Sequence, residues 1–318
     1  MGQYVNKMGI FFMKKAWLFP GQGSQKVGMG KDLYNKTDLG KKYFNLANEI
    51  MECDIKSIIF DGPEETLKKT QFTQPAMYII SSLIGKLVID QGFEPDVVAG
   101  HSLGEYSALA ISDAFNFESG LELVKVRSEG MGNANLINKG IMAAIIGLEE
   151  KKVEIICSEY NGHGVAVLAN YNSPSQLVVS GSTDAIQKIL TNAKNAGAKI
   201  AVELNVDGAF HSPLMRPARE ALAHKLNSFE IKNAKYPLYN NVDAKIITEG
   251  DDIKDSLIKQ LERPVLWTKL ISKMIQDGVT SFTEVGQGKV LQGLNRRIDK
   301  NLSSDGIESL SNIKNYCV

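Results

Sequence analysis

The stretch Gly100-His101-Ser102-Leu103-Gly104 has the pattern G-x-S-x-G and joins two segments of different periodicity. Asp96 to Ala99 before it is a short apolar run typical of a strand, and the pattern after it, as far as Ile111, is helical. A nucleophile elbow needs this strand-turn-helix setting, because the turn that exposes the serine is tight and is flanked by small residues. The stretch therefore predicts an α/β protein with Ser102 as a candidate nucleophile.

The same serine has a simpler explanation. Ser102 and Glu105, three residues further on, also match a capping box, in which the serine hydroxyl accepts a hydrogen bond from a helix N–H. A serine that caps its own helix is no nucleophile. The sequence around the motif leaves both interpretations open.

Strand and helix patterns alternate on either side of the motif. Ala16 to Phe19 is a short apolar run that enters the glycine-rich turn Pro20 to Gly23, a helical pattern with turns continues to about Asp90, and Glu118 to Met131 is again helical. Such alternation is typical of an open α/β fold. We expect a large α/β-hydrolase-like domain with a mostly parallel sheet, formed by residues 1–137 and 208–318.

Residues 138–207 have a different order. Strands are predicted at Ile141 to Gly147, Val165 to Ala169, Gln176 to Ser180 and Lys199 to Leu204, with helices at Glu149 to Tyr160 and Thr183 to Ala196. The resulting order, βαββαβ, is that of the ferredoxin-like unit. We expect a small ferredoxin-like subdomain inserted into the large one.

Composition restricts the class of protein. The 318 residues are 43% hydrophobic and 23% charged, and 36 basic side chains balance 36 acidic ones. A formal charge of zero gives no global attraction to nucleic acid or anionic lipid. The three cysteines, Cys53, Cys157 and Cys317, form no CxxC pair, which argues against a disulfide framework or a zinc site and fits a reducing cytoplasm.

No membrane segment is expected. The longest apolar run, Met77 to Ile89, is interrupted by polar residues and falls short of the roughly 18 residues that span a bilayer. The first twelve residues are expected to be a loose extension, with Met13 as a candidate natural start. A monomer is expected.

A nucleophilic serine needs a base, and the chain offers four histidines: His101, His163, His211 and His224. His101 should point away from the serine it precedes, His163 lies in a glycine-flanked loop, and His224 lies inside the predicted helix Pro217 to Leu226. His211 differs, because Ser212-Pro213 after it matches a helix N-cap and first turn. The positive end of that helix would keep the imidazole neutral and able to accept a proton. A histidine that merely packs against the helix entry is the alternative.

Arg127 shares the apolar face of its helix with Leu123, Val124 and Met131. A guanidinium in that position must extend to solvent, pair with an internal acid, or bind an anionic ligand. Only the last would serve catalysis, because a guanidinium near the nucleophile binds a substrate carboxylate through two hydrogen bonds. The sequence alone leaves the three choices open.

An oxyanion hole can be formed by the backbone N–H of Leu103, after the nucleophile, and by that of Gln22 in the glycine turn. The turn Pro20 to Gly23 matches neither GxGxxG nor a GK[ST] ending, so a nucleotide-binding loop is not expected. The chain also contains no HExxH or other metal-ligand cluster, and no metal is expected.

With these residues in place, the chain resembles the malonyl-CoA:acyl carrier protein transacylases, within the acyltransferase family of fatty-acid and polyketide synthesis. The resemblance runs from Lys14 to about Ile298 through ordered blocks: PGQGSQ (20–25), TQPA (73–76), GHSLGEYSAL (100–109), KVR (125–127), MAAIIGL (142–148), NYNSP (170–174), FHSPLM (210–215), NNVD (240–243), QLERPVLWTK (260–269) and EVGQGKVLQGL (284–294).

The resemblance implies a ping-pong transfer of malonyl from malonyl-CoA to the phosphopantetheine thiol of acyl carrier protein, in the cytoplasm and with no cofactor beyond the coenzyme A thioester. Ser102 would be the nucleophile, His211 its base, and Arg127 the group that holds the malonyl carboxylate. It further implies that the main-chain carbonyl of Gln260 orients the histidine, and that Gln22 and Leu103 form the oxyanion hole. The small subdomain would cover the cleft.

Two departures and two alternatives accompany the resemblance. Gln287 stands where the family usually has proline, and Ala209-Phe210-His211-Ser212 resembles the sequence of malonyl-selective domains, where the aromatic ring leaves little room for an α-methyl group.

A discrete acyltransferase of a polyketide pathway fits the same residues. A serine hydrolase that edits acyl thioesters fits the elbow but not Arg127. Candidate contacts for the carrier protein are Lys194, Lys199, Arg296 and Arg297.

Overall fold

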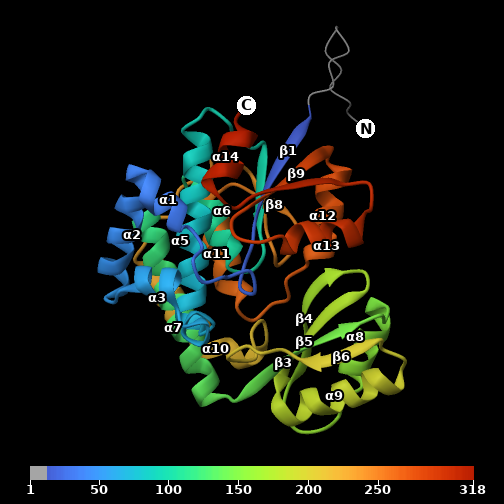
Figure 1. Ribbon diagram of the computed structural model, residues 1–318. Coiled ribbons are helices and arrows are strands. Elements are labelled where there is room, and N and C mark those ends of the chain that lie inside the picture. Colours follow the sequence, from blue (N-terminus) through green and yellow to red (C-terminus); the bar gives the residue numbers. More distant parts are fainter. Residues whose placement is uncertain (1–12) are drawn as a thin grey trace.

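The computed structural model describes residues 13–318 and contains two separate sheets (Figure 1). The expected loose extension, residues 1–12, lies outside the described residues, which begin at the candidate start Met13. The larger sheet and its helices fill the upper part of the view in Figure 1, and the smaller sheet lies below it. The α/β class predicted from the sequence is confirmed.

The larger sheet has six strands in the order β10-β9-β1-β2-β7-β8. Neighbours pair in parallel, except that β8 runs antiparallel to β7. The strands are β1 (Lys14–Phe19), β2 (Val97–Gly100), β7 (Leu238–Tyr239), β8 (Ile246–Ile247), β9 (Val279–Val285) and β10 (Ser303–Ile307). The sheet is therefore mixed and mostly parallel, as predicted.

Helices cover both faces of this sheet. Trp17 and Phe19 of β1 pack with α5 and α7 on one face, while Ala16 and Leu18 pack with α12 and α13 on the other. Because successive side chains of a strand point to opposite faces, burial on both sides explains why β1 is continuously apolar. The helices around the sheet are α1 (Lys31–Lys36), α2 (Asp38–Met51), α3 (Ile55–Asp61), α4 (Glu64–Leu67), α5 (Thr70–Ile89), α6 (Gly104–Ile111), α7 (Phe117–Ile137), α10 (Arg216–Asn227), α11 (Gly250–Gln260), α12 (Trp267–Gln276), α13 (Val290–Ile298) and α14 (Leu310–Tyr316).

Helix α5 contains the apolar run Met77 to Ile89, which the sequence showed to be interrupted by polar residues. The helix is continuous over 20 residues and begins at Thr70. With a mean hydropathy of 1.3 over its most apolar window, it is the one helix in residues 13–318 long and apolar enough to cross a membrane by those measures alone. In the structure 78% of that window is buried inside the protein. Its polar residues Ser81 and Ser82 are buried as well.

The smaller sheet is antiparallel, with the strand order β4-β5-β3-β6. Its elements follow the predicted order: β3 (Gly140–Ile146), α8 (Glu150–Ser158), β4 (Ala166–Ser173), β5 (Gln176–Ser182), α9 (Thr183–Asn195) and β6 (Ile200–Glu203). One face of the sheet packs against these two helices through Ala143, Ile145 and Val179. The other face carries Met142 and Val178, which belong to the core of the large part of the chain.

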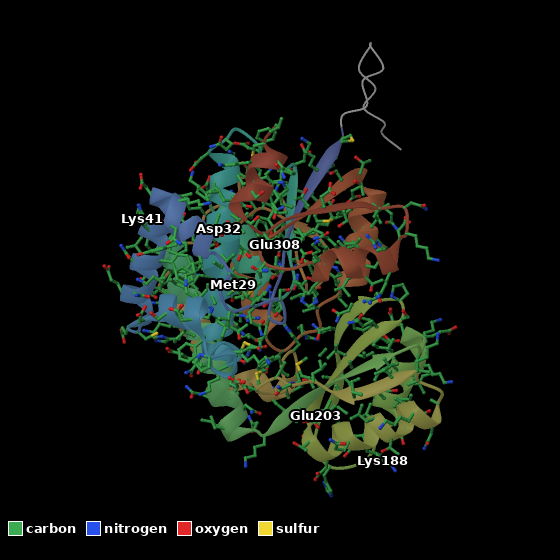
Figure 2. The ribbon with its side chains drawn as sticks, in the orientation of Figure 1. Met29, Asp32, Lys41, Lys188, Glu203 and Glu308 are labelled. Carbon is green, nitrogen blue, oxygen red and sulfur yellow. The ribbon has the colours of Figure 1, made fainter. Side chains whose placement is uncertain are left out.

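Strand β4 joins the small sheet to the segment that precedes α12. The backbone N–H of Tyr171 donates to the carbonyl of Val265 at 2.9 Å, and the N–H of Val265 donates to the carbonyl of Ala169 at 2.8 Å. These bonds fix β4 against the large part of the chain at Val265. Charged side chains such as Lys41 and Lys188 project outward from α2 and α9 (Figure 2).

Candidate active site

Ser102 lies in a sharp turn between β2 and α6. Its φ of +53° is in the left-handed region, which a residue with a Cβ adopts only under strain of roughly 1–3 kcal/mol. Glycine is required on both sides: a Cβ on Gly100 would lie 1.9 Å from the carbonyl carbon of Gly104, and one on Gly104 would lie 2.0 Å from the carbonyl oxygen of Phe19. The strained turn therefore has the form predicted for a nucleophile elbow.

The serine hydroxyl does not cap its helix. Its Oγ lies 2.8 Å from Nε2 of His211 and accepts a hydrogen bond from Nη2 of Arg127 at 2.9 Å. Leu103 occupies the N-cap position of α6, where no side chain caps the helix. The carboxyl group of Glu105 bonds other partners, so the capping-box alternative is wrong. The structure instead brings together the three residues that the sequence singled out.

His211 is held by the carbonyl groups of a loop at the end of α11. Its Nδ1 lies 2.9 Å from the carbonyl oxygen of Gln260 and 3.2 Å from that of Arg263. Because a carbonyl oxygen only accepts, Nδ1 carries the proton and Nε2 presents its lone pair to the hydroxyl of Ser102. The Gln260 carbonyl lies where the resemblance implied, and the contact with Arg263 is an addition.

The neutrality of His211 has causes that the sequence did not show. Ser212 does cap the following turn, accepting from the N–H of Leu214 at 3.3 Å, but that turn is a three-residue 3₁₀ segment. Burial, followed by the positive charge of Arg127, lowers the pKa of His211 to about 3. The imidazole is therefore neutral because it is desolvated beside a cation, at the entrance to a turn that leads directly into α10.

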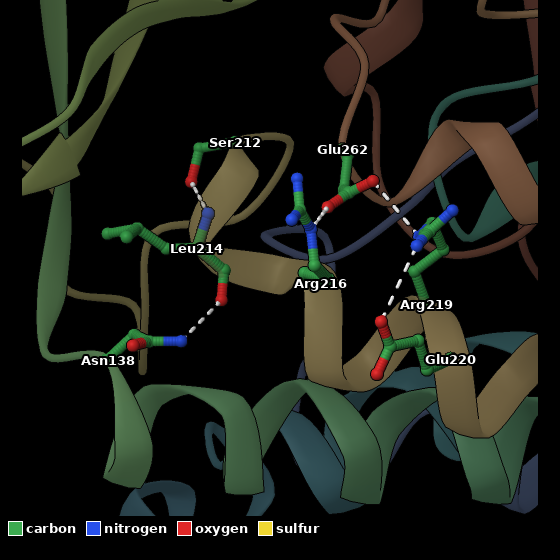
Figure 3. A network of polar contacts seen from close by, with 7 residues as sticks. All are labelled: Asn138, Ser212, Leu214, Arg216, Arg219, Glu220 and Glu262. Atoms are coloured by element: carbon green, nitrogen blue, oxygen red, sulfur yellow. Dashed lines mark hydrogen bonds and ion pairs between the residues drawn. The ribbon is translucent and has the colours of Figure 1, made fainter.

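Ion pairs join α10 to the loop that carries the carbonyl partners of His211 (Figure 3). Glu262 lies in the loop between Gln260 and Arg263, and its two carboxylate oxygens face Nε of Arg216 at 3.4 Å and Nε of Arg219 at 3.0 Å. Both arginines belong to α10, which begins five residues after His211. The network joins the segment that carries the base to the loop that orients it.

Arg127 is fully buried, so its side chain does not extend to solvent. Its hydrogen bonds go to uncharged oxygens: Nη1 donates to Oε1 of Gln74 at 2.6 Å, and Nη2 donates to Oε1 of Gln260 and Oγ of Ser102, both at 2.9 Å. Within the described chain its Nε has no hydrogen-bond partner. A buried guanidinium with no carboxylate in direct contact retains the capacity to bind an anion.

A cavity of about 160 Å³ opens in front of Ser102. It is lined from the large part of the chain by Gln22, His101, Ser102, Leu103, Phe210 and His211, and from the small sheet and its connections by Met142, Asn170, Asn172, Val178, Leu204 and Val206. The backbone N–H groups of Gln22 and Leu103 bond no other backbone group in residues 13–318, which leaves both available to an oxyanion. Arg127 lies behind the serine rather than on the cavity wall.

A serine on a strained elbow, a neutral histidine and a buried arginine thus converge on one hydroxyl group. The family model described as acyl transferase domain matches residues 16–309. The chain belongs to this family.

Curated and solved relatives of this acyl transferase cover almost all of its length. The malonyl CoA-acyl carrier protein transacylase of Bacillus subtilis is 41% identical over 95% of both chains. A transacylase of the same name from Coxiella burnetii superposes with a TM-score of 0.92 at 37% identity, covering 96% of this chain and 97% of that one. A malonyl-transacylase solved with its type II PKS acyl-carrier protein has a TM-score of 0.91 at 36% identity, covering 95% and 98%.

His101, which was expected to point away from Ser102, is among the residues that line the cavity of this acyl transferase. Its Nε2 lies 2.8 Å from Oδ1 of Asn172 on β4, and its ring centroid lies 5.4 Å from that of Trp267. Burial lowers the pKa of His101. His163 and His224 are exposed, as expected for histidines outside the site.

Three residues of the site were not identified from the sequence: Gln74, Glu105 in its observed role, and Asn241. Each lies in a motif that carried the resemblance, but none had a local signal: even Gln74 is one of several polar residues on α5. Gln287 bonds Oε2 of Glu308 at 2.9 Å, in a turn that does not line the cavity. Among residues 13–318 no cluster of three or more potential metal ligands occurs.

Proposed function

We propose that the chain transfers a malonyl group from malonyl-CoA to the phosphopantetheine thiol of acyl carrier protein. The observation that carries this proposal is the buried guanidinium of Arg127, which lies 2.9 Å from the hydroxyl of Ser102 and within residues 13–318 has no hydrogen bond or ion pair to a carboxylate. An acyl group that ends in a carboxylate supplies the missing negative charge when its thioester carbon reaches the serine. The names of the relatives support the same substrate and acceptor.

The first half-reaction acylates the serine. Oγ of Ser102 attacks the thioester carbon while its proton passes to Nε2 of His211, and the developing oxyanion is bound by the N–H groups of Gln22 and Leu103. The C–S bond then breaks, and coenzyme A leaves as a thiol with the proton that the histidine returns. The Gln260 carbonyl stabilises the imidazolium that forms between these two transfers.

The second half-reaction repeats these steps with a different thiol. The phosphopantetheine thiol loses its proton to His211 and attacks the acyl carbon, and the serine leaves with that proton. The reaction needs no cofactor beyond the coenzyme A thioester, and we assign it to fatty-acid synthesis in the cytoplasm. A discrete polyketide acyltransferase is the second candidate, favoured by the likeness to a malonyl-transacylase solved with a type II PKS carrier protein.

The same proposal includes the division of the chain. Residues 138–207 form a ferredoxin-like subdomain that covers the cavity, and residues 1–137 and 208–318 form the α/β-hydrolase-like catalytic domain. The order β3-α8-β4-β5-α9-β6 and the antiparallel pairing of its strands support the first assignment. The strand-turn-helix at Ser102 supports the second.

A two-step mass measurement tests the transfer. Mixing the protein with malonyl-CoA should add the mass of one malonyl group to the chain, and adding acyl carrier protein that bears phosphopantetheine should remove that mass and place it on the carrier. Carrier protein without the prosthetic group is the control. Release of free malonate at the same rate with and without the carrier would favour the hydrolase instead, and failure to form any adduct would refute the proposal.

The low pKa of His211 predicts an unusual pH profile for acylation. A histidine with an ordinary pKa of about 6.5 loses half of its base form at that pH, whereas His211 stays neutral far below it because its pKa is about 3. We expect kcat/KM for malonyl-CoA to vary by less than about twofold between pH 8 and pH 5, since this quantity follows the free enzyme. A fall to half near pH 6.5 in stopped-flow acylation would contradict the expectation.

A further inference from the structure

Glu105 is a fully buried carboxyl group that the mechanism above does not use. It lies in the first turn of α6, three residues after Ser102, and both of its oxygens accept hydrogen bonds. Oε1 accepts from the backbone N–H of Asn241, and Oε2 accepts from Nε2 of Gln260 at 2.6 Å. Two N–H donors directed at one buried carboxyl group indicate that the group serves as an acceptor on both sides.

The bond to Glu105 decides which way the amide of Gln260 faces. Nε2 of Gln260 donates to Glu105 and also to the carbonyl oxygen of Ser102 at 2.9 Å. With its nitrogen on that side, the amide turns Oε1 toward Nη2 of Arg127 at 2.9 Å. Since an amide presents donors at one end and an acceptor at the other, reversing Gln260 would set its NH₂ group against the guanidinium.

The other oxygen of Glu105 acts on the elbow. Oε1 of Glu105 accepts the backbone N–H of Asn241. The side chain of Asn241 in turn bonds the elbow twice: its Oδ1 accepts the backbone N–H of Ser102 at 2.7 Å, and its Nδ2 donates to the carbonyl oxygen of Gly100 at 2.7 Å. Asn241 therefore holds the strained turn from both sides. One carboxyl group thus links the residue that fixes the nucleophile to the residue that orients the arginine.

We infer that Glu105 is a positioning residue for acyl selectivity: by fixing the orientation of the Gln260 amide, it holds Arg127 where a substrate carboxylate can bind. The inference rests on the proposed function, because it assigns to Glu105 the placement of the group that recognises malonyl. Glu105 itself touches neither cavity nor substrate. Its effect reaches the reaction through Gln260 and Arg127.

Replacement of Glu105 by glutamine has a defined structural consequence. The backbone N–H of Asn241 is fixed at the end of β7, so the remaining oxygen at position 105 stays with it, and the new NH₂ group faces Gln260. Two donors then oppose each other, so the Gln260 amide either shifts away from position 105 or reverses to offer its oxygen and gives up its bond to the Ser102 carbonyl. Either movement displaces the oxygen that Arg127 bonds, while the volume of the side chain at position 105 is unchanged.

Glu284 provides a matched control for the general effect of changing a buried acid. It is also fully buried, and its carboxylate accepts the N–H groups of Leu291 and Gln292 at the start of α13, both at 3.1 Å. It does not line the cavity, and within residues 13–318 its carboxylate bonds Leu291 and Gln292 rather than any residue of the site. Glu284→Gln should therefore lower the thermal midpoint without changing which acyl group is preferred.

The test is to measure acylation by malonyl-CoA and by acetyl-CoA with Glu105→Gln, Glu105→Asp, Gln260→Met, Glu284→Gln and the double variant Glu105→Gln with Gln260→Met. We expect Glu105→Gln and Glu105→Asp to lower the malonyl:acetyl ratio of kcat/KM by about tenfold or more, mainly by raising KM for malonyl-CoA. Gln260→Met should lower the ratio similarly, and the double variant should lower it by less than about threefold beyond the single ones, because both act on Arg127.

The outcomes separate the inference from its foundation. An unchanged ratio in the Glu105 variants, an equal fall in Glu284→Gln, or strictly multiplicative effects in the double variant would overturn the positioning role. Loss of folding in both Glu105 variants while Glu284→Gln folds would overturn it as well, in favour of a purely structural acid. If the wild-type protein forms no malonyl adduct, the proposed function fails first; if it does form one, only the inference is at stake.

Discussion

Replacing Ser102 by alanine is expected to abolish the malonyl adduct and to reduce transfer to the carrier protein by about a thousandfold or more. The hydroxyl is the only group within hydrogen-bond distance of both Nε2 of His211 and Nη2 of Arg127, so no other nucleophile in the described chain is activated in the same way. Intact-mass measurement after mixing with malonyl-CoA reports the adduct, and a coupled assay with the carrier protein reports the transfer.

Ser107→Ala is the matched control for this experiment. Ser107 lies on the same helix, α6, is buried, and has an Oγ without a hydrogen-bond partner within residues 13–318. Its replacement should leave the adduct in place. A malonyl adduct that persists in Ser102→Ala would show that the reactive group lies elsewhere and would remove the basis of the proposed mechanism.

The elbow also predicts a difference between two inactive variants. At a φ of +53° alanine keeps the strain of serine, whereas glycine relieves it. The free energy of unfolding, measured by denaturant titration, should therefore be about 1–2 kcal/mol higher for Ser102→Gly than for Ser102→Ala.

The elbow could be predicted because its features are local. A short strand, small flanking residues and a helix follow one another directly in the sequence.

Residues that meet the serine from distant parts of the chain were harder to predict. His211 was found because only four histidines exist, and Arg127 because it lies on an apolar helix face. Glu105 was visible only as a cap, since its true partners, Asn241 and Gln260, come from segments more than 130 residues away. Pairings of that kind follow from tertiary packing and leave no local periodicity.

The cause of a pKa shift was equally hidden from the sequence. A helix N-terminus after His211 could be inferred from Ser212-Pro213, but burial and the neighbouring charge of Arg127 exist only in the folded protein. His101 shows the same limit. Its direction depends on Asn172, which β4 brings from the small sheet. Sequence patterns predicted which residues matter better than they predicted what surrounds them.

Arg127→Ala should reverse the preference for the acyl group. Without the guanidinium the malonyl carboxylate would be buried without a partner, so kcat/KM for malonyl-CoA should fall by roughly 10- to 100-fold, corresponding to about 1.5–3 kcal/mol for hydrogen bonds to a charged group. Acetyl-CoA needs no such partner. Removing the cation also raises the pKa of His211 toward its ordinary value, which strengthens the base, so acetyl transfer should hold or increase.

The malonyl:acetyl ratio is the appropriate measurement, because both rates come from one preparation and the fraction of active protein cancels. Cancellation is needed: the variant leaves the Oε1 atoms of Gln74 and Gln260 without their donor, which should lower the free energy of unfolding by about 1–3 kcal/mol for each. Arg127→Lys keeps the charge without the planar fork and should retain part of the preference. An unchanged ratio in Arg127→Ala would mean that the carboxylate binds elsewhere, and the guanidinium would then act only on the serine and histidine it already touches.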